Sequence, residues 1–188
     1  MANICVFCSS NDNLSKEYIQ LAEEVGRLLG SKGHTLVYGG SKRGLMGTIA
    51  SATRTHGAQN GSRVIGVLPK IFESLADGED ELVATQNLRD RKIEMELRSD
   101  AFITLPGGLG TLDEFGDITT TRLLEIHNKP SVLVNLGGFY DPLLAQIKLM
   151  YEKGFITHSK RELFKVVSSA KEALEYIEKS LASMKIAS

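Results

Sequence analysis

The chain alternates short, continuously apolar segments with longer amphipathic segments, and this alternation restricts its fold more than any other feature. Each apolar segment has the length of a strand, and most end in glycine, proline or serine. Because such strands are apolar on both faces, we expect a sheet that is covered by helices on both sides. The predicted strands are residues 3–9, 34–40, 63–69, 100–108, 131–138 and 163–168.

The amphipathic segments carry apolar residues at helical spacing. They predict helices over residues 16–33, 44–57, 87–99, 111–128, 140–154 and 169–184. A repeated strand–helix–strand order implies parallel strands joined by right-handed crossovers. The sequence therefore predicts an α/β fold, a single doubly wound domain over residues 1–188 with a mainly parallel sheet. Residues 72–86 fit neither pattern, so we expect a long irregular excursion there.

Charge and hydropathy exclude several classes of protein. The net charge of -1 argues against nucleic acid or an anionic membrane as the main partner. No apolar run reaches the length of a membrane span. The first ten residues lack the charged lead and long apolar core of a signal peptide, so we expect a cytoplasmic location.

Cys5 and Cys8 have the C-x-x-C spacing of some redox and metal sites. A zinc site would need further ligands, and the chain has no second cysteine pair. Residues three apart in a strand also point to opposite faces. We therefore predict two reduced thiols in or near the core, and no metal.

The loops that follow the predicted strands are the expected place for a ligand, because open parallel sheets bind ligands beyond the carboxyl ends of their strands. The loops 39–47 (GGSKRGLMG) and 106–114 (PGGLGTLDE) are rich in glycine and open directly into helices. Exposed backbone N–H groups and the helix dipole favour a phosphate there. Lys42 and Arg43 add positive charge, so we predict an anion site at this edge, with Ser9 and Gly40 as further candidates for contact with the ligand.

Neither loop is a known cofactor motif. No G-x-G-x-x-G follows the first strand with an acid at the distance needed to bind a dinucleotide ribose, and no G-x-x-x-x-G-K-[ST] is present. An NAD enzyme and a P-loop nucleotidase are therefore disfavoured, and no cofactor is expected.

Glu114 has two interpretations. If Thr111 is the N-cap of the following helix, T-x-x-E is a capping box in which Glu114 accepts a hydrogen bond from the Thr111 N–H group. A carboxylate at the edge where ligands bind could instead stabilise an oxocarbenium-like sugar or orient water. In the same way, Arg91 and Lys92 are either part of a solvated helix face or an anion clamp.

The ordered motifs GGSKRGLMG, RVIGVLP, RKIEM, SDAFITLPGGLGTLDE and NKPSVLVNLGGFYDPL resemble the LOG family, the cytokinin riboside 5'-monophosphate phosphoribohydrolases formerly labelled lysine decarboxylases. The resemblance runs from Ile4 to Ile156, and the signature P-G-G-x-G-T-x-x-E is complete. It implies a Rossmann-like fold, a homodimer whose site is shared between subunits, and hydrolysis of the N-glycosidic bond of adenine-type nucleoside 5'-monophosphates. The products would be the free base and ribose 5-phosphate.

Matched position by position, the family's catalytic arginine and glutamate are Arg91 and Glu114. The resemblance also implies substrate contacts by Glu73, Arg91, Lys92, Gly107, Gly108, Leu109, Gly110, Thr111, Leu112, Asp113, Glu114 and Thr120. Ser41 departs from the family pattern where a third glycine is usual, and Thr121 departs from it where relatives often have tryptophan. Two alternatives stay open: a nucleotide-binding protein of this fold without hydrolysis, and a general AMP nucleosidase.

Overall fold

The computed structural model describes residues 1–76, 78–156 and 162–187 of the chain. Its described strands form one parallel sheet in the order β4-β3-β2-β1-β5-β6-β7. The strands are β1 (Asn3–Phe7), β2 (Thr35–Tyr38), β3 (Val64–Pro69), β4 (Glu81–Thr85), β5 (Ala101–Thr104), β6 (Ser131–Val134) and β7 (Lys165–Val167). The predicted parallel α/β architecture is confirmed.

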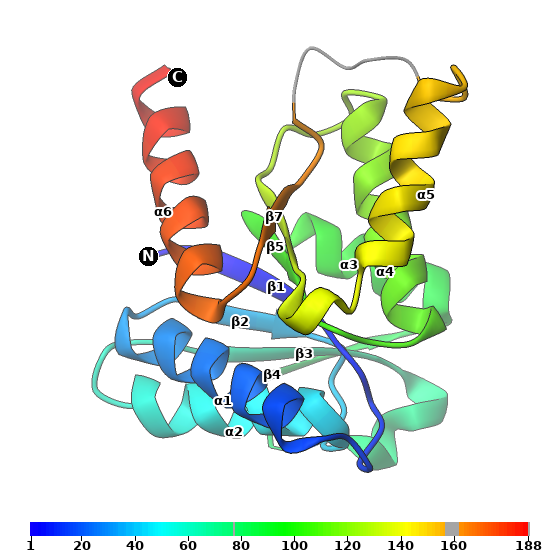
Figure 1. Cartoon of the computed structure of the whole chain (residues 1–188). Helices are drawn as coiled ribbons and strands as arrows, with labels where there is room; N and C mark the ends of the chain where they lie inside the picture. Colours follow the sequence, from blue (N-terminus) through cyan, green and yellow to red (C-terminus); the bar gives the residue numbers. More distant parts are fainter. Residues whose placement is uncertain (77, 157–161, 188) are drawn as a thin grey trace.

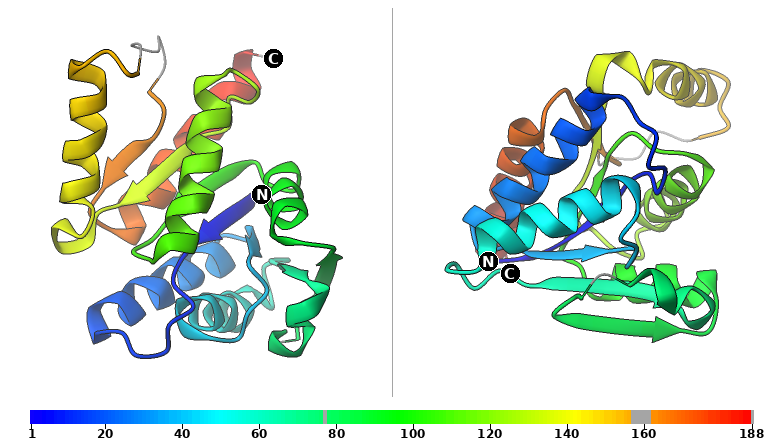
Figure 2. Two further views of the ribbon diagram at one scale, coloured as in Figure 1. Left: turned by 90° about the vertical axis from the view of Figure 1, so that its right-hand side faces the viewer. Right: turned by 90° about the horizontal axis from the view of Figure 1, so that it is seen from below.

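Helices cover both faces of this sheet (Figures 1 and 2). The helices are α1 (Lys16–Ser31), α2 (Gly44–Gly57), α3 (Leu88–Leu97), α4 (Leu109–Leu123), α5 (Asp141–Glu152) and α6 (Ala170–Ala187). Side chains of α1, α2 and α6 pack on one face, and those of α3, α4 and α5 pack on the other. The right-hand view of Figure 2 shows α1 and α2 side by side. No helix in the described ranges is long and apolar enough to span a membrane.

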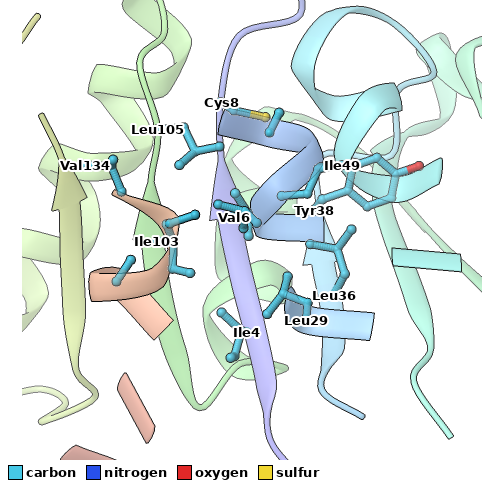
Figure 3. Close-up of a cluster of buried hydrophobic side chains, with 14 of the residues drawn as sticks. Ile4, Val6, Cys8, Leu29, Leu36, Tyr38, Ile49, Ile103, Leu105 and Val134 are labelled. Atoms are coloured by element: carbon cyan, nitrogen blue, oxygen red, sulfur yellow. The ribbon is translucent and has the colours of Figure 1, made fainter. Parts of the chain in front are cut away.

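The central strand β1 sends alternate side chains into the two cores. Ile4, Val6 and Cys8 join the larger cluster, drawn in Figure 3, while Cys5 and Phe7 point to the opposite face. Both cysteines are buried free thiols. The predicted separation of the two thiols is confirmed, and their burial gives each a packing role.

The expectation for residues 72–86 was wrong. This stretch contains the end of a 3₁₀ helix, η1 (Lys70–Leu75), and the strand β4, which pairs with β3 from Ile65 opposite Glu81 to Pro69 opposite Thr85. Partly buried and exposed positions alternate from Glu81 to Ala84 of β4, which lies at one edge of the sheet. A half-exposed strand has no continuous apolar run, and that was the signal we used to find the others.

Most predicted strands extend too far at their carboxyl ends. Residues 34–40 are an example, since β2 ends at Tyr38 and Gly40 has a φ of +68°. A positive φ is incompatible with a strand and leads the chain into the loop before α2. This places the loops that follow β1, β2 and β5 together at one edge of the sheet.

Candidate active site

A cavity of about 570 Å³ lies at the carboxyl edge of the sheet. Four structural elements line it: the loop after β1, the start of α2, the helix α3 and the start of α4. The lining residues are Cys8, Ser9, Ser10, Asn11, Arg43, Met46, Arg91, Gly108, Leu109, Gly110, Thr111 and Glu114. A cavity of about 670 Å³ elsewhere, between the end of α4 and α6, is larger but does not contain these groups. We place the candidate site in the cavity of about 570 Å³, because the N-terminus of α4 and a buried ion pair meet there.

The ion pair joins α3 to α4. Nη2 of Arg91 lies 2.9 Å from Oε1 of Glu114, and both side chains are largely buried, with exposed fractions of 15% and 8%. Nε of Arg91 donates a hydrogen bond to the backbone carbonyl of Val67 at 3.1 Å. A Cβ atom at Gly39 would overlap Nη2 of Arg91, so the absence of a side chain at Gly39 makes room for the guanidinium.

The environment of Glu114 raises the pKa of its carboxyl group to near neutral pH. Burial raises the pKa of Glu114 to about 7, although the positive charge of Arg91 acts in the opposite direction. The negative charge of Asp113 raises the pKa further, and Lys92 lowers it. A carboxyl group with this pKa can both hold and release a proton near pH 7, as general acid–base catalysis requires.

The capping-box interpretation was wrong. Helix α4 begins at Leu109, and its N-cap is Gly108, which provides no side-chain cap. Thr111 is therefore the third helical residue, and its side chain lies against Gly107, where a Cβ would overlap it. Glu114 lies in the second turn and pairs with Arg91. The N–H groups of the first turn have no partner within the helix, and this turn lines the cavity.

The two glycine-rich loops differ in what their helix N-termini contact. At α2, Oδ1 of Asp12 accepts a hydrogen bond from the Gly44 N–H group at 2.7 Å, and Oδ2 lies 3.0 Å from Nε of Arg43. These two contacts lower the pKa of Asp12. A carboxylate of the chain therefore already occupies the N-terminus of α2. Of the two helix N-termini predicted to bind an anion, the N-terminus of α4 remains the candidate.

A family model described as "possible lysine decarboxylase" matches residues 46–177. A cytokinin riboside 5'-monophosphate phosphoribohydrolase of Mycobacterium tuberculosis is 40% identical over 174 residues, which are 91% of this chain and 90% of that protein. The Arabidopsis thaliana enzyme of the same name, LOG3, is 39% identical over 178 residues, which are 93% of this chain and 81% of that protein. The chain belongs to the LOG family.

Solved structures share the fold. The molybdenum cofactor carrier protein of Chlamydomonas reinhardtii superposes with a TM-score of 0.72 at 20% identity, covering 96% of this chain and 98% of that one. A molybdenum cofactor binding protein of Rippkaea orientalis superposes with a TM-score of 0.69 at 23% identity, covering 95% and 96%. At this identity the likeness extends to the architecture alone.

Several of the site positions expected from the sequence line the cavity, and others do not. Ser9, Arg91, Glu114 and residues 108–111 line it. Nζ of Lys92 lies 3.1 Å from Oδ1 of Asp113 and 3.7 Å from Oδ1 of Asp117. The other expected residues that do not line the cavity are Gly40, which lies against Leu68, Gly107 beneath Thr111, Leu112 in the core beside α5, and the exposed Glu73 and Thr120.

A second, smaller cavity of about 260 Å³ adjoins the candidate active site and shares Ser10, Met46 and Arg91 with it. Its other lining residues are mostly apolar: Gly39, Ser41, Leu68, Pro69, Phe72, Leu75 and Leu88. The sequence analysis did not find this pocket, because η1 and the ends of β3 and α3 form it only in the folded chain. Among the described residues, no cluster of three or more His, Cys, Asp or Glu side chains could hold a metal.

Proposed function

We propose that this chain hydrolyses the N-glycosidic bond of N6-substituted adenine riboside 5'-monophosphates and releases the free base and ribose 5-phosphate. The observation that carries the proposal is the buried Arg91–Glu114 pair in the same cavity as the first turn of α4. The names of relatives with about 40% identity over most of the chain support the same reaction.

In this proposal the 5'-phosphate binds the N–H groups at the start of α4, from Gly108 to Thr111. This places the ribose near Glu114. As the bond from C1' to the base breaks, positive charge develops on the sugar, and the carboxylate of Glu114 stabilises it. Water adds through its oxygen to C1', and Glu114 takes up the proton that the water loses. The departing base takes one proton from solvent, and Glu114 afterwards releases its proton to solvent, so the reaction balances and the carboxylate is restored.

Arg91 has two roles in this mechanism. Its positive charge favours the ionised form of Glu114, which is the form that stabilises the developing cation. Its bond to the Val67 carbonyl fixes the guanidinium in the position needed for the pair. Arg91 also lines both cavities, so it lies where the base and the sugar would meet.

The adjoining apolar pocket supports an N6-substituted base. Its apolar side chains, among them Leu68, Phe72 and Leu75, can bury a hydrophobic substituent that adenine itself lacks. Base release from AMP, isopentenyladenosine monophosphate and GMP, followed by chromatography, tests this. We expect the isopentenyl substrate to have the highest kcat/KM. Tight nucleotide binding without base release would instead identify a non-catalytic binding protein.

We also propose a homodimer, with residues such as Glu73 contributing to the site of the neighbouring subunit. Leu88, Ile93 and Leu97 of α3 are 54%, 55% and 69% exposed, which is unusual for large apolar side chains on one short helix. A second copy that packs on the face of α3 that carries Ile93 and Leu97 would bury both side chains. We further propose that the chain forms a single domain and that it works in the cytoplasm.

A further inference from the structure

Arg43 connects the loop after β2 to the candidate active site. It immediately precedes α2 in an extended conformation, with φ -92° and ψ 151°, and its side chain lines the cavity that the first turn of α4 also lines. None of the residues that the family resemblance assigns to substrate binding is Arg43. Its place in the cavity therefore needs a separate explanation.

Two arginines line the cavity among the described residues, and they differ in how they are held. Arg91 is largely buried, and its guanidinium contacts Glu114 and the Val67 carbonyl. The Arg43 side chain is 57% exposed, and its ion pair with Asp12 uses Nε. A guanidinium has five N–H donors, so this pairing leaves donors that can bind a ligand.

Asp12 keeps Arg43 beside the cavity without lining the cavity itself. One of its carboxylate oxygens is bound to the Gly44 N–H group at the start of α2, and the other pairs with Arg43. The carboxylate is therefore anchored to the backbone, and the arginine is anchored to the carboxylate. This arrangement reduces the conformational entropy that Arg43 would lose when it binds a ligand.

We propose that Arg43 is a specificity-determining residue whose guanidinium binds the same phosphate group as the amide groups of α4. The inference rests on the proposed function and adds a residue that recognises the terminal phosphate ester of its substrate. The forked donors of a guanidinium match two oxygens of a phosphate. Arg43 then selects phosphorylated ribosides over unphosphorylated ones, although the N-terminus of its own helix is occupied by Asp12.

The test compares Arg43→Gln, Arg43→Lys and the wild-type protein. Arg63→Gln is the matched control, because Arg63 is 55% exposed and pairs with Glu81 at 3.3 Å, away from the cavity. The probe is ribose 5-phosphate, with its binding measured by calorimetry, and the substrate is isopentenyladenosine monophosphate. We expect Arg43→Gln to weaken binding of the probe and to raise KM by about tenfold, the scale of a charge-assisted hydrogen bond, with kcat within about twofold.

Arg43→Lys should recover part of the affinity, because it keeps the charge and loses the fork. Unchanged binding in Arg43→Gln would overturn the proposal, and so would an equal loss in Arg63→Gln, which would indicate a general charge effect. Thermal unfolding of each variant checks that the fold is intact. If the wild-type protein binds ribose 5-phosphate in an Arg43-dependent way but releases no base from any nucleotide, the proposed hydrolysis fails while the role of Arg43 stands.

Discussion

Arg91 and Glu114 hold each other in a buried position, with Nη2 of the arginine 2.9 Å from Oε1 of the glutamate. The two residues come from α3 and α4, which pack on the same face of the sheet. Without this partner, the buried carboxyl of Glu114 would lose the larger of the two positive charges that lower its pKa, and Lys92 would remain. With it, the carboxyl group has a pKa of about 7 and lies beside a helix N-terminus that attracts phosphate.

Replacing Glu114 with Gln should abolish most of the turnover. The amide has nearly the same shape but cannot carry the negative charge, so we expect kcat to fall by about 10²–10⁴. Glu24→Gln is the control, because Glu24 belongs to an exposed ion pair with Arg27 on α1. Base release under saturating substrate measures the effect. Near-normal turnover in Glu114→Gln would rule out its catalytic role.

Removing the Arg91 charge should change the pH profile as well as the rate. Arg91 lowers the pKa of Glu114, so Arg91→Ala should move that pKa above its value of about 7. If the ionised carboxylate is the active form, the rising limb of kcat against pH shifts upwards in this variant. A pH–rate series on both proteins measures the shift. If the rising limb lies at the same pH in both proteins, it reports the ionisation of a group other than Glu114.

The pKa of Glu114 also makes a prediction for stability. In an unfolded chain a glutamate has a pKa of about 4.3, so the raised folded-state value means that the fold prefers the protonated form. This contribution to stability is complete below about pH 4.3 and is lost as the pH rises through about 7. We expect a loss of about 4 kcal/mol in the free energy of unfolding relative to Glu114→Gln. Urea unfolding at several pH values measures it, and parallel curves for the two proteins would contradict it.

Local patterns predicted each described strand except β4, and the strands that they predicted include β7 at the opposite edge of the sheet. The strand β1, for example, is buried at each position from Ile4 to Phe7 and stands out as an apolar run. The edge strand β4 alternates instead and was missed. Its place in the sheet follows from pairing with β3, which no local pattern encodes.

The site shows the same division. Glycines before a helix correctly indicated the N-terminus of α4, but one of the two interpretations of Glu114 made Thr111 the N-cap, because T-x-x-E is the pattern of a capping box. The helix instead begins at Leu109, and the Thr111 side chain lies against Gly107. The cap that Asp12 provides for α2 spans distant parts of the chain, so the sequence could not indicate it. The proximity of Arg91 and Glu114 came from family resemblance, because nothing in either local segment requires the other.

The proposed dimer predicts that a charge on α3 produces a monomer. Ile93 and Leu97 are four residues apart on one helix face, and both are exposed in the single chain. Ile93→Glu would place a charge in the apolar contact, so light scattering should report the mass of one chain at micromolar concentration. Ile186→Glu on α6 is the control, because Ile186 is 88% exposed and lies on another helix. A wild-type mass equal to one chain would refute the dimer.

Gly39 should control activity through Arg91 and not through the fold. A methyl group at this position would overlap Nη2 of Arg91 and would lie 2.8 Å from Sδ of Met46. The nearest atoms belong to the ends of flexible side chains, so Gly39→Ala should shift the arginine at little cost in thermal stability. A displacement of about 1 Å at a catalytic group can reduce the rate by about 10²-fold, and we expect a loss of that size in kcat/KM.

The double variant Gly39→Ala with Arg91→Ala isolates the cause. If Gly39 acts only by making room for Arg91, the double variant should be no slower than Arg91→Ala alone. A further loss in the double variant would show that Gly39 affects the site by a second route, such as the position of Met46.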